Sequence, residues 1–562
     1  MRVSPFSLMV ALTILLSPNA AGQEVPLVSG TRPNIVLIVS DDQGFGDLSA
    51  MGHPVLKTPN LDRLKSESVW LRRFYASPLC APTRAQILTG RHQFRTGVWD
   101  TWGGRTNLAA DEKTLASYLG QSGYETGIFG KWHLGENYPF RPHDRGFDVS
   151  VIWNNFDRFA PTFSRNGVNT LPQAGFLDDV VTDEAIRFMR QPRERPFFAY
   201  VPLWLPHSFR NKQVPDEYVR LFHDLTDATQ QDREVLGMIT NLDHNVGRIM
   251  AALRESGLED NTLVVFISDN GLTERQGPAA SYNAGLRGRK TTVYEGGIRV
   301  PCFIRWPGKL PPRQVDEIAS VIDLLPTFRD VAGVGPYQSP VDGKSLWPLL
   351  KGAVGTLGPR YFVQQQQPQK SGLSPQPFVN ATVIGQDYKL IFRDGPDSAE
   401  LYDLIADEAE QHDLARVRPA TVSRLKAYYM RWFDEISAGR GFDPNPAILG
   451  HPAQVEFRES MIQVSEKYGL SLQVERAGNY EVELLQIQTD LFPQEGALGL
   501  TDGKSIWKGP VSADTQKVTL KVNLPKGMVR LWPWSAGKTI KGGYVPVGAD
   551  PGCRQLVIRG PL

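Results

Sequence analysis

The sequence predicts an α/β fold in which helices cover a mostly parallel sheet, and three stretches carry that prediction. Residues 34–40 (Asn-Ile-Val-Leu-Ile-Val-Ser) and 262–268 (Thr-Leu-Val-Val-Phe-Ile-Ser) are continuous apolar runs rich in β-branched side chains. Such runs are typical of strands buried on both faces. Between them, residues 229–255 repeat apolar side chains at helical spacing. Strand, helix and strand alternating in this way favour a parallel sheet.

The remaining elements of the first 350 residues continue this alternation. Thr58-Pro59-Asn60 marks a helix start, because threonine is a favoured N-cap and proline fits the first turn. We then expect a strand at 69–75, a helix at 115–119, and strands at 126–129 and 196–201.

The composition shifts after Leu350. Gln364–Gln367 is a polar run followed by Pro and Ser, which indicates a loop, and two short strands at 378–393 and a helix at 421–436 follow. Residues 439–454 are rich in Gly and Pro and predict a linker. Beyond it, alternating patterns at 480–487, 517–522 and 528–531 predict an accessory β-sandwich-like domain over 455–562.

Length and charge limit the class of protein. A chain of 562 residues suggests two to four domains. The net charge of +1 gives no indication of a nucleic-acid partner. Any anion site must therefore be local.

The N-terminus has the pattern of a secretory signal over residues 1–22. Arg2 is the positive end, residues 6–16 form an apolar core, and residues 19–22 are suited to cleavage. That core is too short to span a bilayer, and no later segment is long and apolar enough. We expect an exported protein, periplasmic or extracellular, with no membrane span; the alternative is a buried N-terminal helix.

One segment around a cysteine stands out. Residues 79–91 read Leu-Cys-Ala-Pro-Thr-Arg-Ala-Gln-Ile-Leu-Thr-Gly-Arg, which contains Cys-x-Pro-x-Arg starting at Cys80. A lone cysteine is usually a small buried hydrophobe. The extended segment, however, resembles the signature of type I sulfatases, of the alkaline-phosphatase-like superfamily. The resemblance implies that Cys80 is oxidised to formylglycine by a formylglycine-generating enzyme. Cys302 and Cys553 either pair or remain two thiols.

Oxygen-bearing side chains follow both buried strands. Asp41 and Asp42 come after the first, and Asp269 and Asn270 after the second. Ligand sites of open α/β sheets lie at such strand ends, and oxygen ligands without His or thiolate favour Ca²⁺ or Mg²⁺. Taken singly, these are also ordinary turn residues. The resemblance implies that the four side chains bind a divalent cation, usually Ca²⁺, together with the oxygen of the formylglycine at Cys80.

Two further motifs resemble the same family. Gly-Lys-Trp-His-Leu-Gly at 130–135 places Lys131 and His133 two apart, and residues 285–301 place Lys290 on the family's active-site lysine. Without the resemblance they would be a polar surface loop and a solvated basic cluster. His207, preceded by proline, matches the family's catalytic histidine after a strand. His143 is interpreted as structural or substrate-lining.

The resemblance also implies a mechanism. A divalent cation with Arg84, Lys131 and Lys290 would neutralise an anionic sulfate ester. One hydroxyl of the hydrated formylglycine attacks sulfur, and His207 or Lys290 gives the leaving alcohol a proton. His133 then takes the proton of the other hydroxyl, and sulfate is expelled as the aldehyde re-forms.

Together these features predict an exported sulfatase acting on aryl or carbohydrate sulfates, small molecules or glycans. The resemblance covers about residues 32–414. We expect a catalytic domain over 23–355 and a small C-terminal α+β subdomain over 356–438. Two alternatives stay open at this point: a phosphate or phosphonate monoester hydrolase on the same scaffold, and a non-catalytic glycan-binding relative.

Overall fold

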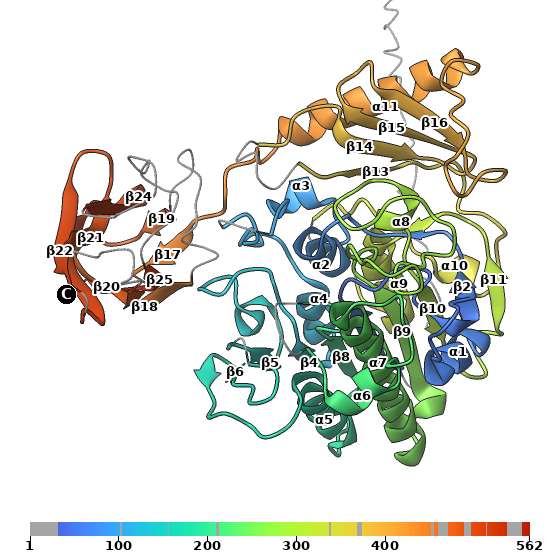
Figure 1. The fold of residues 1–562 in the computed structure, drawn as a ribbon, viewed down its shortest axis with the longest axis horizontal. Coiled ribbons are helices and arrows are strands. Elements are labelled where there is room, and N and C mark those ends of the chain that lie inside the picture. Colours follow the sequence, from blue (N-terminus) through green and yellow to red (C-terminus); the bar gives the residue numbers. More distant parts are fainter. Residues whose placement is uncertain are drawn as a thin grey trace, which may run out of the picture. The chain divides into compact units, whose positions relative to one another are not determined.

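The fold comes from a computed structural model, which describes residues 32–101, 104–155, 157–208, 213–335, 339–367, 374–450, 454–458, 470–487, 496–512, 514–536 and 553–561. Figure 1 shows the ribbon. The described residues belong to one compact unit that begins at Arg32. The predicted signal segment, 1–22, lies outside them.

A ten-stranded sheet forms the centre of the first 350 residues. Its order is β11-β2-β10-β9-β1-β8-β4-β5-β6-β7, and the five strands from β9 to β5 run parallel. The α/β prediction with a mostly parallel sheet is thus confirmed. The strands are β1 Asn34–Ser40, β2 Val69–Leu71, β4 Glu125–Gly130, β5 Val149–Trp153, β6 Phe163–Arg165, β7 Val168–Asn169, β8 Phe197–Pro202, β9 Thr262–Ser268, β10 Cys302–Arg305 and β11 Arg313–Val315.

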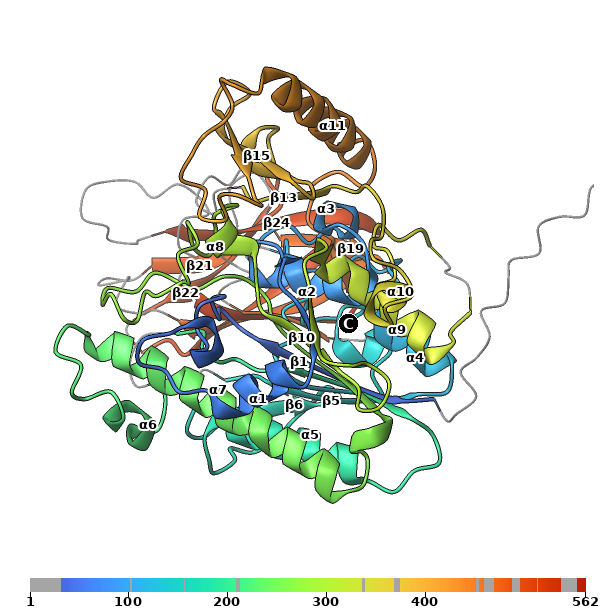
Figure 2. The same ribbon diagram turned by 90° about the vertical axis from the view of Figure 1, so that its right-hand side faces the viewer.

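Helices cover both faces of this sheet, as Figure 2 shows. Alternate residues of β1 enter two different cores: Ile35 and Leu37 pack with α2, α4 and α9, whereas Val36 and Ile38 pack with α1, α5 and α7. Because neither face of β1 meets water, its sequence is continuously apolar. The helices are α1 Pro59–Ser66, α2 Cys80–Thr89, α3 Gln93–Thr96, α4 Leu115–Gln121, α5 Leu177–Arg190, α6 Asp216–Arg220, α7 Gln230–Glu255, α8 Glu295–Ile298, α9 Leu324–Ala332 and α10 Trp347–Leu350.

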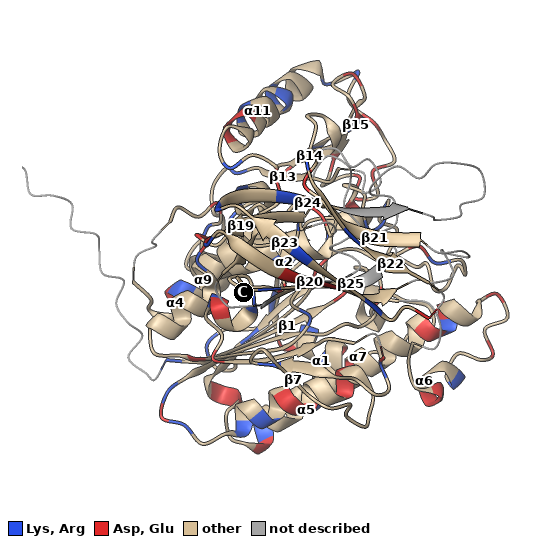
Figure 3. Cartoon of the chain, turned by 90° about the vertical axis from the view of Figure 1, so that its left-hand side faces the viewer, with Lys and Arg blue, Asp and Glu red and all other residues tan. Residues whose placement is uncertain are grey.

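Local signals explain where two helices begin. Thr229 caps α7 in a capping box with Asp232, which fixes the predicted start. Thr58 precedes α1 as expected, but its hydroxyl does not cap the helix. It donates to the Asp62 carboxylate at 2.9 Å and accepts from the Ser49 N–H at 2.9 Å. On α5, acidic side chains occupy the first turn and basic ones the last, as the helix dipole favours (Figure 3).

One predicted strand is divided. Residues 69–75 form β2 and then β3 (Phe74–Tyr75), which pairs with β12 (Ala319–Ser320) in a separate sheet. The break falls at Arg73, whose buried guanidinium donates to the carbonyl of Asp316 at 2.8 Å. That bond draws the chain from one sheet to the other just before the Cys80 segment.

An antiparallel sheet with one long helix follows the central sheet. Its strands are β13 Phe362–Gln365, β14 Val379–Ile384, β15 Tyr388–Asp394 and β16 Ala399–Asp403, and α11, Pro419–Ser437, packs on one face. The loop predicted for Gln364–Gln367 is wrong, because Gln364 and Gln365 belong to β13 and all four glutamines are buried. Gln365 accepts from the Tyr429 hydroxyl at 3.0 Å, a polar bond inside the core.

The last described strands form two sheets over one apolar core. The sheets have the orders β17-β19-β24-β21-β22 and β18-β25-β20-β23. This arrangement agrees with the β-sandwich-like prediction, although the domain boundaries themselves stay predictions. The strands are β17 Ala447–Leu449, β18 Gln454–Arg458, β19 Leu470–Val474, β20 Gly478–Ile487, β21 Gly496–Thr501, β22 Ile506–Val511, β23 Lys517–Leu524, β24 Gly527–Ala536 and β25 Cys553–Arg559.

Candidate active site

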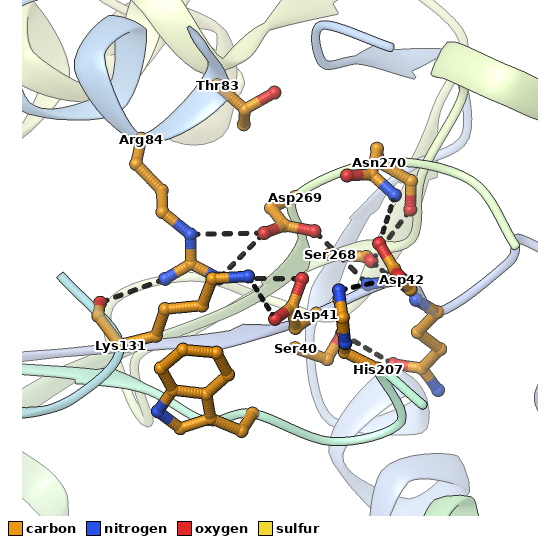
Figure 4. Close-up of polar contacts among 12 residues, drawn as sticks. Ser40, Asp41, Asp42, Thr83, Arg84, Lys131, His207, Ser268, Asp269 and Asn270 are labelled. Carbon is orange, nitrogen blue, oxygen red and sulfur yellow. Dashed lines mark hydrogen bonds and ion pairs between the residues drawn. The ribbon is translucent and has the colours of Figure 1, made fainter. Parts of the chain in front are cut away.

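The four oxygen-bearing side chains meet at one edge of the sheet, as predicted. Asp41 and Asp42 leave β1 beside Asp269 and Asn270 at the end of β9, because the two strands are parallel neighbours in register. The Asp42 N–H donates to Asp269 Oδ1 at 3.2 Å, and Asn270 Nδ2 donates to Asp42 Oδ1 at 2.8 Å (Figure 4). None of the four is more than 1% exposed.

Several oxygens in this group accept no hydrogen bond from the described part of the chain. They are Asp41 Oδ1, Asp42 Oδ2 and Asn270 Oδ1. One ligand atom each of Asp41, Cys80 and Asp269 also lie within 4.8 Å of one another. A buried oxygen without a donor is costly, and a hard divalent cation satisfies several at once. The residues present therefore fit the metal that the resemblance implies.

Each carboxylate of the group faces a cation. Arg84 Nη2 contacts Asp269 Oδ2 at 2.6 Å, Lys131 Nζ contacts Asp41 Oδ2 at 2.5 Å, and Lys290 contacts Asp42. Three positive and three negative side chains balance, so an added divalent cation would leave a net positive site. Such a site attracts an anion such as a sulfate ester.

The pKa values of Asp41 and Asp269 shift in opposite directions. Burial raises the pKa of Asp269 to about 7, with further repulsion from Asp41. Burial also acts upward on the pKa of Asp41, but Lys131, His207 and Arg84 outweigh it and hold that pKa below its usual value. Asp41 therefore keeps its negative charge at neutral pH.

Cys80 is the first residue of α2 and is 2% exposed. Burial raises the pKa of its thiol, so the unmodified cysteine is a poor nucleophile at neutral pH. Arg84 lies one turn further along α2, where residues four apart share a face. Its guanidinium also donates to the Lys131 carbonyl at 3.1 Å, which ties α2 to the end of β4.

Both predicted histidines lie at the same edge. His207 Nε2 is 3.7 Å from Asp42 Oδ2, and burial lowers the pKa of His207 to about 4. Burial, followed by repulsion from Lys131 and Arg84, lowers the pKa of the half-buried His133 well below its ordinary value. Both imidazoles are thus neutral at pH 7. His143 instead lies in a turn beside Asp144, with its Nε2 3.9 Å from the carboxylate.

The segment that carries Lys290 packs against the β13–β16 sheet. Asn380 on β14 donates to the Thr291 carbonyl at 2.8 Å, and Val293 joins an apolar cluster with Ile391 and Tyr402. The sheet thus holds the residues that directly follow Lys290.

That contact includes a buried ion cluster. Lys389 on β15 lies 2.9 Å from Glu295, the first residue of α8, and 2.8 Å from Glu410. The Glu410 carboxylate also accepts from the Glu295 N–H at 2.8 Å. These charged side chains are at most 1% exposed.

Sequence reasoning missed Trp204. Lys131 Nζ lies 4.7 Å from the centroid of this indole, a distance at which the cation and the ring attract each other. Trp204 follows β8 and is three residues before His207, which is the only signal that could have suggested it.

Comparison with known proteins identifies the family. The Sulfatase model matches residues 33–334, more than half of the chain, and a model described as N-sulphoglucosamine sulphohydrolase, C-terminal, matches residues 288–426. The chain belongs to the sulfatase family. It is a sulfuric ester hydrolase, and the family in general implies a metal and a formylglycine.

Individual relatives agree with this membership. N-acetylgalactosamine-6-sulfatase of Canis lupus familiaris is 32% identical over 61% of this chain and 70% of its own length. Arylsulfatase A of Homo sapiens is 29% identical over 80% of this chain and 96% of its own. Among solved structures, Ps i-CgsB in complex with k-i-k-neocarrahexaose matches with a TM-score of 0.65 and 25% identity, covering 73% of this chain and 95% of that one.

Among the described helices, none is both long and apolar enough to cross a membrane.

Proposed function

We propose that this protein is an exported sulfatase that hydrolyses sulfate esters of carbohydrates, with formylglycine at position 80 and Ca²⁺ as its metal. The group of buried oxygens without donors at the ends of β1 and β9, beside Cys80, carries the proposal. Export rests on the sequence pattern of residues 1–22.

Asp41, Asp42, Asp269 and Asn270 would hold the cation together with residue 80. When bound, the cation supplies positive charge that neutralises the sulfate ester and polarises its S–O bonds. We assign calcium because Mg²⁺ binds with several of its own waters, whereas these side chains are at most 1% exposed.

Formylglycine would supply a hydrated aldehyde with one hydroxyl to attack sulfur and a second whose proton can be removed. Because Cys80 is 2% exposed, the maturation enzyme must reach it before the chain folds. Arg84, one turn along α2, is placed to hold the group at position 80 against Asp269.

Charged side chains around position 80 would bind and orient the ester. Lys131 and Lys290 neutralise its anionic oxygens. We assign His207 as the proton donor to the leaving alcohol. Its imidazole is neutral in the free site, and the negative charge of the bound ester would favour its protonation. The ion pair with Asp42 raises the pKa of Lys290 against burial and makes that lysine a weaker acid than a protonated imidazole. The neutral His133 is suited to accept a proton during release of sulfate.

The carbohydrate assignment is supported by relatives. One is named N-acetylgalactosamine-6-sulfatase, and one matching structure is a complex with k-i-k-neocarrahexaose. Both are properties of those proteins, and they favour a glycan over a steroid or a simple aryl sulfate here.

The test is sulfate release from a panel of sulfated glycans, measured beside 4-nitrophenyl sulfate and 4-nitrophenyl phosphate. We expect turnover of at least one sulfated sugar and a large preference for the sulfate over the phosphate of the same phenol. Equal turnover of the two phenyl esters would favour a phosphate monoester hydrolase. Turnover of the aryl sulfate alone would reject the carbohydrate assignment.

The role of His207 has its own test. A lost proton donor slows poor leaving groups more than good ones, so His207→Gln should reduce kcat/KM for an alkyl or sugar sulfate far more than for 4-nitrophenyl sulfate. An equal loss on both substrates, with an unequal loss in Lys290→Met, would move the donor role to Lys290.

A further inference from the structure

We propose that the buried ion pair between Arg158 and Asp178 is a positioning pair that fixes His207 in the active site. The inference rests on the proposed function of this site. It assigns a role to two residues outside the catalytic group, on a loop and on α5.

The pair holds both ends of one turn. Residues 204–207 follow β8 and close on themselves through a bond from the His207 N–H to the Trp204 carbonyl at 3.0 Å. At the first end, the Trp204 N–H donates to Asp178 Oδ1 at 2.8 Å. At the second, Arg158 Nη2 donates to the His207 carbonyl at 2.7 Å. Arg158 Nη1 lies 3.6 Å from Asp178 Oδ2, which connects the two anchors.

Both members of the ion pair are buried. The Arg158 side chain is 3% exposed and that of Asp178 is fully buried. Burial lowers the pKa of Arg158 and raises that of Asp178 to about 7, while each partner opposes the shift of the other. Removing two charges from water is costly, so such a pair is weak as a source of stability. Its consequence is geometric, since one nitrogen of the rigid, planar guanidinium donates to the His207 carbonyl while another faces Asp178.

The turn reaches the catalytic group at three points. The Leu205 carbonyl accepts from the Asp41 N–H at 2.8 Å, and the indole of Trp204 lies against Lys131. His207 itself extends toward Asp42. Because Arg158 binds the backbone of His207, losing that bond frees the imidazole to move relative to the other two contacts. A shift of about 1 Å at a reacting group can cost about 100-fold in rate.

A double-mutant cycle in kcat/KM tests the proposal, measured on the alkyl or sugar sulfate whose poor leaving group depends on His207. Arg158→Met should lower kcat/KM by about 30- to 100-fold in the native background and by less than about 3-fold in His207→Gln, because no imidazole is left to misplace. Equal factors in both backgrounds would overturn it. The matched control is Arg165→Met, which breaks a 2.7 Å ion pair with Glu184 on the same helix α5 and should change neither background.

Arg158→Met leaves a buried carboxylate without a partner and risks misfolding. The second variant is therefore Arg158→Met with Asp178→Asn, which is neutral and keeps an acceptor for the Trp204 N–H. It should fold and still lose activity, and a return to native kcat/KM would overturn the proposal. Failure of the donor role would look different: His207→Gln would then show no dependence on the leaving group, whatever the cycle reports.

Discussion

Replacing Lys389 with methionine tests whether the buried ion cluster couples the β13–β16 sheet to the segment after Lys290. The ammonium lies 2.9 Å from Glu295 and 2.8 Å from Glu410, and all three side chains are at most 1% exposed. At an effective dielectric constant of about 20, each contact is worth about 6 kcal/mol of attraction, most of it offset by lost hydration. The remaining two carboxylates repel each other.

The net cost follows from what the variant leaves behind. Burial raises the pKa of Glu410 to about 7, so this group takes up a proton readily once Lys389 is gone. The Glu295 carboxylate then keeps Arg299 at 3.6 Å and the Tyr75 hydroxyl at 3.2 Å but loses its shortest ion pair. About 3–5 kcal/mol of unfolding free energy is the usual loss when a buried pair is broken. We expect Lys389→Met to lose that amount in urea unfolding followed by tryptophan fluorescence.

Arg393→Met provides a matched control on the same strand. It breaks a 3.3 Å pair with Glu400, but the arginine side chain is 61% exposed, so the loss should stay below about 1 kcal/mol. Adding Glu410→Gln to Lys389→Met should recover part of the loss. Unfolding of Lys389→Met within 1 kcal/mol of native, or an equal loss in Arg393→Met, would refute the reasoning.

Three further predictions concern the metal, pH and domain boundaries. Asp269→Ala should abolish calcium binding in calorimetry and sulfatase turnover while circular dichroism stays native; unchanged calcium affinity would reject the ligand assignment. The pKa of Glu410 rises from 4.5 to about 7 on folding, so its contribution to the free energy of unfolding is complete below pH 4.5 and is lost as pH rises through 7. The expected fall in that free energy is about 3 kcal/mol. Glu410→Gln should remove that slope from unfolding measured between pH 4.5 and 8, and an unchanged slope would assign it to other groups. Truncation after Gly450 should leave a soluble enzyme active on 4-nitrophenyl sulfate, whereas an insoluble or inactive product would place the β-rich tail within the catalytic unit.

The sequence predicted best where chemistry and strand ends coincide. Asp41 and Asp269 directly follow two continuous apolar runs that mark buried strands, so their meeting at one sheet edge follows from a parallel sheet. Cys80 and Arg84 belong to one contiguous motif, which needs no tertiary information, although the helix that carries both was not predicted.

The failures share a cause, which is that burial of polar groups depends on partners far away in the chain. Gln364–Gln367 had the composition of a loop, yet its members are buried, with Gln365 bonded to Tyr429. Lys389 would ordinarily be placed at the surface, because lysine is rarely buried without a partner. Its partner Glu295 is 94 residues away in the sequence, and no local pattern predicts a pair over that distance.

For the same reason, the sequence alone could not identify the residues that support His207. Arg158 lies in none of the motifs that the sequence offers, and Asp178 begins an amphipathic helix where acidic residues are ordinary. Only the fold brings both to the turn at 204–207.

The most direct test of the central claim compares the state of residue 80 with activity. Preparations made with different amounts of a formylglycine-generating enzyme would be digested, and the peptide carrying residue 80 weighed by mass spectrometry. Conversion removes sulfur and two hydrogens from the cysteine and adds an oxygen, so both forms are resolved. We predict that sulfatase activity rises in proportion to the converted fraction and extrapolates to zero when none is converted. Full activity from a preparation in which residue 80 is wholly cysteine would contradict the account.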